Sequence, residues 1–282
     1  MVLVAVSLGF LADRLWVQAD SLRWEADEGL IVTAVLGSLL YAVACLFLAR
    51  AWQQLLGLFG TAHISALTAA WIYAKSQIGK YVPGNVLHIV GRHFLGRTLG
   101  ISHGTLALAA AGEISGLLAA ASTLALIAAV VLSLGPQKGS LLWAALGAVS
   151  AAAIAVLALP RLWSFLHRRF PDLPEPDAGS LRRGLLGAFG LYLLFFITAG
   201  SILVGLVAVE KDSLTASLGA LAMLVFAVSW LAGFVTPGAP AGLGIREAVI
   251  VLLLEQLGLG DEALQIALVF RLPAPAVRVR AR

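Results

Sequence analysis

The chain has 282 residues, of which 60% are hydrophobic and 12% are charged, and its mean hydropathy is +0.96. These values exclude an ordinary soluble globular domain, because too few charged residues are present to cover a surface that faces water. The formal net charge is +4 and comes mainly from basic loops, which favours anionic lipid headgroups over nucleic acid as partners. We therefore predict an all-α, polytopic membrane helix bundle that forms one transmembrane domain over residues 1–282.

The first half of the chain, residues 1–134, contains a broken apolar region between two predicted spans. Residues 30–49 and 105–134 are each long enough to cross about 30 Å of hydrocarbon as a helix. Between them, residues 61–99 are apolar but are interrupted at 80–85 by the sequence Lys-Tyr-Val-Pro-Gly-Asn. Proline and glycine interrupt helices, so we predict a break at this point.

The second half, residues 139–282, repeats this pattern. Two of its segments are predicted to span the membrane: residues 141–159 and 185–209. A polar loop that contains prolines separates them at 161–183. Residues 214–257 are apolar and are interrupted at 236–247 by a segment rich in proline and glycine. Breaks that recur in both halves of a membrane protein are typical of transporters, in which they line the binding cavity.

Basic residues in short loops predict which side of the membrane each loop faces. The loop at 161–183 holds five arginines and is therefore placed in the cytoplasm, while the acidic stretch 20–28 faces outward. With this alternation, the regions 61–99 and 214–257 enter and leave the membrane from opposite sides. We predict two opposed re-entrant hairpins that form an inverted repeat, in a multi-pass protein of the cell (inner or plasma) membrane. The alternative is that their arms cross the membrane completely, since each arm is about 30 Å long as a helix.

The motifs at the two breaks resemble those of a known family. The residues that carry the resemblance are Lys75, Lys80-Tyr81-Val82-Pro83-Gly84-Asn85, Gly91-Arg92 and Gly242-Leu243-Gly244-Ile245-Arg246-Glu247. Over nearly its whole length, the chain resembles the lysylphosphatidylglycerol synthase transmembrane-region family, a flippase-like membrane domain. The resemblance implies a role in moving or presenting charged or glycosylated lipids. The chain is similar to stand-alone members without the aminoacyl-transfer domain, so lysyl transfer is not implied.

Two segments differ from what the resemblance implies. The sequence Glu113-Ile114-Ser115-Gly116 stands where the family is expected to have Glu-Arg followed by an acidic residue, so an ion network built on that arginine is not expected here. Residues 272–282, with two prolines and three arginines, stand in place of an expected span. A frameshift or a truncation would give this pattern.

The first break supplies residues that suit a phosphate-bearing headgroup. Pro83 and Gly84 can act as a hinge at which a new helix begins, and the N–H groups of that helix end attract anions. Three polar residues follow at spacings of three and four, which places them on one helix face: Asn85, His88 and Arg92. A guanidinium can donate two hydrogen bonds to phosphate, and a charge inside a membrane usually marks a binding site or pathway. The alternative is that Arg92 reaches the interface or pairs with Glu113 for stability.

The second break is predicted to complete the site. Its hinge residues are Pro237, Gly238, Gly242 and Gly244. A helix is expected to restart near Ile245 with Arg246 and Glu247 in its first turn. Glu247 favours the helix dipole, which is its structural explanation, whereas Arg246 opposes the dipole and therefore suggests an anionic partner. We assign the following residues to substrate binding: Lys80, Asn85, His88, Arg92, Glu113, Arg246 and Glu247.

The sequence favours no metal site and no cofactor. His88 and His93 are five residues apart and do not share a helix face, and His103 begins a helix. Cys45 is the single cysteine, so a disulfide within the chain is excluded. No ATPase phosphate loop is present, so transport would be downhill, coupled to ions through Glu113 or Glu247, or driven by a partner enzyme.

The function that these features favour is a flippase-like protein, not an enzyme. It would bind and translocate or present an anionic or glycosylated lipid, either a phospholipid or a polyprenyl-phosphate-linked lipid. One alternative is an accessory subunit that positions a partner glycosyltransferase without transporting lipid. A second alternative is a membrane-embedded glycosyl- or phosphotransferase that uses the outer acidic stretch. The carboxylates of that stretch are Asp20, Glu25, Asp27 and Glu28.

Overall fold

The computed structural model describes residues 28–60, 64–81, 87–133, 178–211, 215–236, 239–256 and 258–271, the pairs 24–25 and 278–279, and positions 9 and 168. Eight α-helices lie in these ranges: α2 (Glu28–Phe59), α3 (Ala66–Gln77), α4 (Leu87–Thr98), α5 (His103–Ser133), α7 (Ala178–Glu210), α8 (Ala216–Val235), α9 (Ile245–Glu255) and α10 (Gly260–Arg271). Two 3-10 turns, η1 (Ile78–Tyr81) and η2 (Pro240–Gly242), and one antiparallel pair of short strands, β1 (Trp24–Glu25) and β2 (Arg278–Val279), complete the described part. The predicted all-α class is confirmed.

Four of these helices, α2, α5, α7 and α8, are long and apolar enough to cross a membrane. The shortest, α8, has 20 residues, which corresponds to about 30 Å of helix and matches the hydrocarbon thickness of a bilayer. The chain is therefore a membrane-embedded, multi-pass protein within the described ranges. The spans predicted at 105–134 and 185–209 are confirmed as α5 and as part of α7.

Two predicted boundaries were wrong. The span predicted at 30–49 does not end at Arg50, because α2 continues to Phe59. The Arg50 guanidinium donates a hydrogen bond to Gln53 one turn further along the same helix, so the charge is accommodated on the helix surface. The predicted loop at 161–183 is helical at its end, since α7 begins at Ala178. The span predicted at 141–159 lies outside the described residues.

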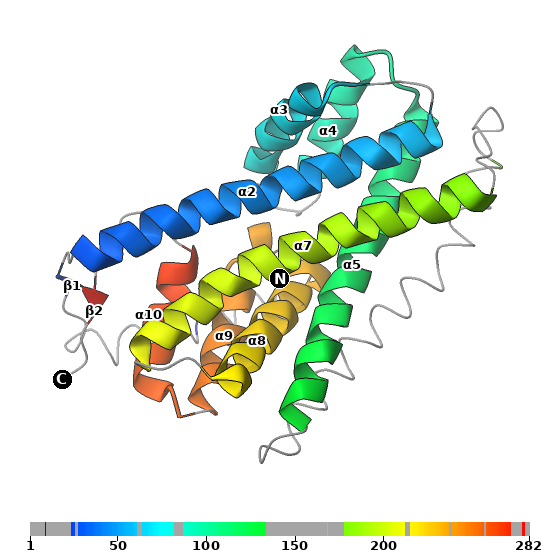
Figure 1. Cartoon of the computed structure of the whole chain (residues 1–282). Coiled ribbons are helices and arrows are strands. Elements are labelled where there is room, and N and C mark those ends of the chain that lie inside the picture. The colour runs from blue at the N-terminus through cyan, green and yellow to red at the C-terminus, as the bar shows by residue number, and fades with distance from the viewer. Residues whose placement is uncertain are drawn as a thin grey trace.

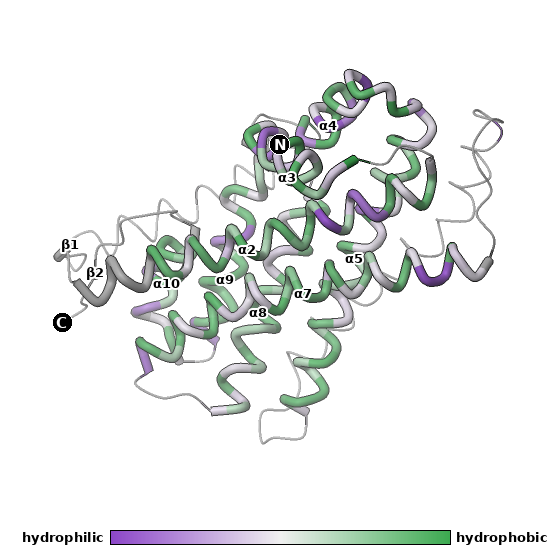
Figure 2. The backbone as a smooth tube through the Cα atoms, turned by 45° about the horizontal axis from the view of Figure 1, so that its top comes forward, coloured by the Kyte–Doolittle hydropathy of each residue, from purple (hydrophilic) through white to green (hydrophobic). Residues whose placement is uncertain are grey.

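The spanning helices pack against one another around a core of large apolar side chains. Figure 1 shows α2 and α7 running side by side, with α8 and α5 against α7. Their contacts bury Trp52, Leu55, Phe196 and Leu224 almost completely, and small residues such as Ala120 let α5 approach its neighbours closely. Hydrophobic residues run along the spanning helices, as Figure 2 shows. Many of them are exposed on the outer surface, as expected of side chains that face lipid.

Helices α3 and α4 form a short pair on either side of the first break. Each has 12 residues, about 18 Å of helix, which is too short to cross about 30 Å of hydrocarbon. Both helices expose large apolar side chains, with Leu67 80% and Phe94 68% accessible. The end of the first arm approaches α4 closely, since a Cβ added to Gly79 of η1 would lie 2.8 Å from the backbone nitrogen of His88. The arms of this pair are therefore packed together next to the break.

The second break separates α8 from α9. Three of the described residues between them have a positive φ: Ala241 (51°), Gly242 (71°) and Gly244 (83°). The helix that restarts at Ile245 is confirmed as α9, and it has 11 residues, so it is only about half as long as a spanning helix. It packs on α8 and α10, and η2 contacts η1. The two breaks, more than 150 residues apart in the sequence, therefore meet in the folded chain.

Candidate functional site

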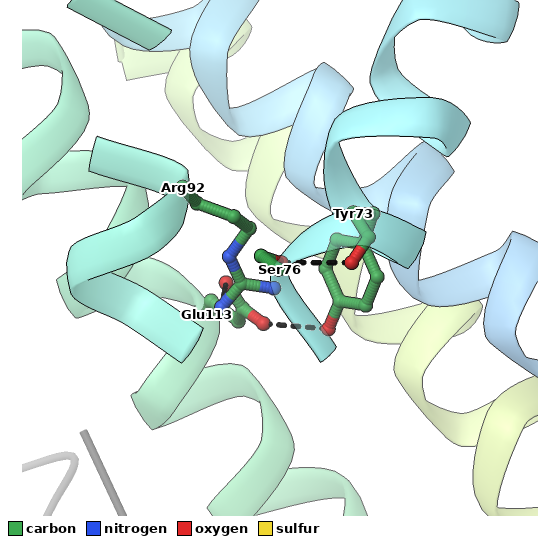
Figure 3. A network of polar contacts seen from close by, with 4 residues as sticks. All are labelled: Tyr73, Ser76, Arg92 and Glu113. Atoms are coloured by element: carbon green, nitrogen blue, oxygen red, sulfur yellow. Dashed lines mark hydrogen bonds and ion pairs between the residues drawn. The ribbon is translucent and has the colours of Figure 1, made fainter. Parts of the chain in front are cut away.

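A buried ion pair lies between α4 and α5. The Nη2 atom of Arg92 is 2.9 Å from Oε2 of Glu113, and the two side chains are only 3% and 4% exposed. Arg92 comes from the helix after the first break, and Glu113 comes from a spanning helix (Figure 3). The pairing of Arg92 with Glu113, which the sequence left as an alternative to headgroup binding, is therefore present in the structure. A pair of this kind is costly to bury unless further hydrogen bonds complete it.

Tyr73 of α3 supplies one of these hydrogen bonds. Its hydroxyl donates to Oε1 of Glu113 at 2.7 Å, so Arg92 and Tyr73 occupy different oxygens of the same carboxylate. The Arg92 guanidinium carbon also lies 4.3 Å from the centre of the Tyr73 ring, within the range of a cation–π contact. Next to it, the Ser76 hydroxyl donates to the Tyr73 carbonyl at 2.7 Å. Figure 3 shows these four side chains converging from three helices.

The pair leaves hydrogen-bonding capacity unused. A guanidinium has five N–H donors, and among the described residues Nη1 of Arg92 has no hydrogen-bond acceptor. The amide nitrogen of Gln77, one helical turn beyond Tyr73, is also buried without an acceptor in the described part of the chain. Buried donors are normally satisfied. The cluster of Tyr73, Arg92 and Glu113, hereafter the buried cluster, therefore suits a ligand that brings acceptor oxygens.

Arg246 lies in a slot between the second break and α8. A Cβ added to Gly233 of α8 would lie 2.6 Å from Cγ of Arg246, and one added to Gly242 would lie 2.8 Å from its Nε. The guanidinium carbon is 5.5 Å from the centre of the Trp230 ring. Each break is thus followed by an arginine that stacks on an aromatic residue of the preceding helix: Arg92 on Tyr73, and Arg246 on Trp230.

Glu247 caps the start of α9. Its carboxylate accepts a hydrogen bond from the Gly244 N–H at 2.7 Å, and the residue is 5% exposed. This geometry is the structural explanation that the sequence offered for Glu247, because a carboxylate in the first helical turn satisfies free N–H groups and the dipole. The N-terminus of α9 therefore already holds an anionic group from the chain itself.

The remaining predicted site residues are only partly described. His88 is buried on α4, as the helical spacing with Arg92 requires. Several predicted residues lie outside the described part: Pro83, Gly84, Asn85, Pro237, Gly238 and the side chain of Lys80. Tyr73 was missed by the sequence analysis. A single tyrosine in an apolar arm carries no spacing signal, and its role depends on the way α3 is rotated against α5.

A second polar contact links α4 to the start of α5. Nε2 of His93 lies 2.8 Å from Nδ1 of His103, and the two rings stack at an interplanar angle of 25°. Burial lowers the pKa of His93, and nearby His103 and Arg97 lower it further. The sequence analysis missed this pair because it compared His93 only with His88 on the same helix, whereas the turn after α4 brings His103 back to it.

We expect acid to weaken this contact. Because the folded pKa of His93 is lowered, the unfolded chain binds more protons as the pH falls below about 6.5, so stability falls with pH in that window. The melting temperature of the purified protein, measured between pH 7.5 and 5.5, should therefore fall less steeply for His93→Gln than for the wild type. If the melting temperature depended equally on pH in the two proteins, the lowered pKa of His93 would be contradicted.

Comparisons with known proteins add nothing to this geometry: no protein-family model, no curated protein and no solved structure matches the chain. The family resemblance drawn from the two break motifs therefore stays a prediction. What the chain does has to be argued from the buried cluster, the two breaks and the apolar helices around them.

Proposed function

We propose that the chain binds a lipid with an anionic or glycosylated headgroup inside the membrane, and translocates or presents it. The observation that carries this proposal is the buried cluster, which holds an ion pair against α5, a helix apolar enough to span a bilayer. Ionisable groups at membrane depth are expensive and usually mark a substrate or ion pathway. The spare donors of Arg92 match the oxygens of a phosphate in a phospholipid or a polyprenyl-phosphate-linked lipid.

The two breaks support the same proposal. We place α3 and α4 as a re-entrant pair, because both helices are too short to span and both expose apolar side chains. We place the second break opposite, in an inverted repeat whose turns η1 and η2 meet. Its first arm, α8, is long enough to span the membrane, as the alternative from the sequence allowed, and only its second arm, α9, is short. This arrangement follows transporters that bind substrate where broken helices face each other. In this proposal the basic segment 161–183, whose end forms the start of α7, stays on the cytoplasmic side, and the protein lies in the cell membrane.

The test compares the lipids that co-purify with the wild type and with the double variant Arg92→Gln, Glu113→Gln. The double change removes both charges at once, so no unpaired charge is left buried and the net charge stays the same. Mass spectrometry of the purified proteins in mild detergent should find a distinct anionic or polyprenyl-phosphate lipid in the wild type. We expect the variant to retain at least about tenfold less of this lipid, because it loses one or more hydrogen bonds to a charged group.

The matched control is Arg50→Gln, which removes an exposed arginine on α2. It lowers the net charge of the protein, whereas the double variant does not. If the lipid were retained only by nonspecific charge attraction, the amount retained would therefore fall more in the control than in the double variant. Equal, mixed phospholipid in all three proteins would contradict lipid binding at the buried cluster and would favour the accessory-subunit alternative. A second experiment measures movement of the identified lipid between the two leaflets of vesicles that contain each protein.

A further inference from the structure

Tyr192 is a fully buried residue of α7 that no sequence motif singled out. It is 1% exposed, and its ring packs on the backbone of α5. A Cβ added to Gly116 would lie 2.5 and 2.6 Å from two ring carbons of Tyr192. Gly116 follows Glu113 by three residues and therefore lies on the same face of α5. The absence of a side chain at Gly116 is what lets the tyrosine approach this face.

The hydroxyl of Tyr192 lacks a hydrogen-bond acceptor among the described residues. It is buried, and it has no hydrogen-bond partner in the described ranges. Its ring packs on Gly116, one helical turn from Glu113 on the same face of α5. One carboxylate oxygen of Glu113 accepts the Tyr73 hydroxyl, and the other lies 2.9 Å from Nη2 of Arg92 in the ion pair but accepts no hydrogen bond from the described residues. A buried hydroxyl without a partner destabilises the fold, so its place beside the buried cluster calls for an explanation.

The two tyrosines of this region differ in a way that indicates a ligand. Tyr73 approaches Glu113 from α3 and donates its hydroxyl to the carboxylate. Tyr192 approaches from α7 with a donor that the described protein groups leave unused. Arg92 has an unused donor in the same cluster. Two buried donors from separate helices, a guanidinium N–H and a phenol O–H, can be satisfied together by one group with several acceptor oxygens.

We propose that Tyr192 is a further ligand of the substrate headgroup, and that it donates a hydrogen bond to an oxyanion that Arg92 also holds. The ligand class is a phosphoryl-type group with at least two acceptor oxygens, carried by a lipid or free as inorganic phosphate. This inference rests on the proposed function, since it deepens the same site. It assigns α7 a direct part in headgroup binding. The motifs at the two breaks imply no binding residue on this helix.

The experiment uses the purified full-length protein in detergent and measures binding by isothermal titration. The probes are dioctanoyl phosphatidic acid, inorganic phosphate, and dioctanoylglycerol as a lipid without the phosphoryl group. Tyr192→Phe removes only the hydroxyl and keeps the ring on Gly116. We expect it to bind phosphatidic acid about tenfold more weakly than the wild type, because one hydrogen bond to a charged group is lost.

The melting temperature without ligand separates a binding role from a structural one. Tyr192→Phe removes an unsatisfied buried hydroxyl, so its melting temperature should equal or exceed that of the wild type. Tyr73→Phe is the matched control, because it breaks a hydrogen bond that is made and should lower the melting temperature. A lowered melting temperature for Tyr192→Phe, with unchanged affinity for phosphatidic acid, would overturn the inference.

The probes also distinguish the failure of this inference from failure of the proposed function. If the wild type binds phosphatidic acid and Tyr192→Phe binds it equally well, only the role of Tyr192 is refuted. If the wild type binds neither phosphate-bearing probe, binding of a phosphoryl headgroup at the buried cluster is refuted and the inference falls with it. Inorganic phosphate bound as tightly as phosphatidic acid, and more weakly by the variant, would support the oxyanion site with a soluble ligand in place of a lipid.

Discussion

Replacement of Arg92 by methionine is expected to lower the free energy of unfolding by about 3–5 kcal/mol. The change leaves the Glu113 carboxylate buried, with the Tyr73 hydroxyl as its remaining described partner, and a buried charge that has lost its counter-charge is strongly destabilising. Methionine keeps much of the length and apolar volume of the arginine stem, so the effect reports charge more than packing. The measurement is reversible unfolding by sodium dodecyl sulfate in mixed micelles.

A double-mutant cycle provides the control for this prediction. Glu113→Gln alone leaves the Arg92 guanidinium buried without its carboxylate and should destabilise as well. The double variant Arg92→Met, Glu113→Gln contains neither charge, so it should be clearly more stable than the sum of the two single changes implies. Additive effects would mean that the two side chains do not interact, which would contradict the 2.9 Å contact between them.

The class of the protein and several of its spans could be predicted from the sequence because length and apolar composition alone determine whether a helix can cross a bilayer. The restart of α9 near Ile245 was predicted from the proline- and glycine-rich segment before it, where the structure has a positive φ at Gly242 and Gly244. The hydropathy argument failed at Arg50, because one charged residue was taken as a helix end. Arg50 stays inside α2 and bonds to Gln53 one turn away, a local contact that hydropathy does not reveal.

The polar groups of the site were only partly predictable. Arg92 and Glu113 stood out because charge inside an apolar segment is rare, and their pairing was one of two interpretations that the sequence left open. Tyr73 and Tyr192 could not be found this way. Their roles depend on how α3 and α7 are rotated against α5, and a helix pattern that is apolar on all sides does not fix that rotation.

Gly242→Ala is the second change for which we expect a large effect, a loss of about 2–4 kcal/mol in the free energy of unfolding. The backbone of Gly242 has a φ of +71°, which a side chain disfavours. The added Cβ would also lie 2.8 Å from Nε of Arg246 and 3.1 Å from Cα of Gly233. The Arg246 side chain can shift, but the backbone of α8 cannot, so strain and overpacking add at this position.

The comparison for Gly242 is Gly57→Ala. Gly57 lies on the exposed side of α2, and a Cβ added there would meet no atom within 4 Å, so this change should be neutral or stabilise by about 0.5–1 kcal/mol. Unfolding in mixed micelles measures both variants under one condition. Gly242 lies against the Arg246 side chain, so its substitution should also displace the guanidinium from the Trp230 ring. The displacement should change the intrinsic tryptophan fluorescence of the protein. A Gly242→Ala protein as stable as Gly57→Ala would contradict both the positive φ at Gly242 and its close packing against α8.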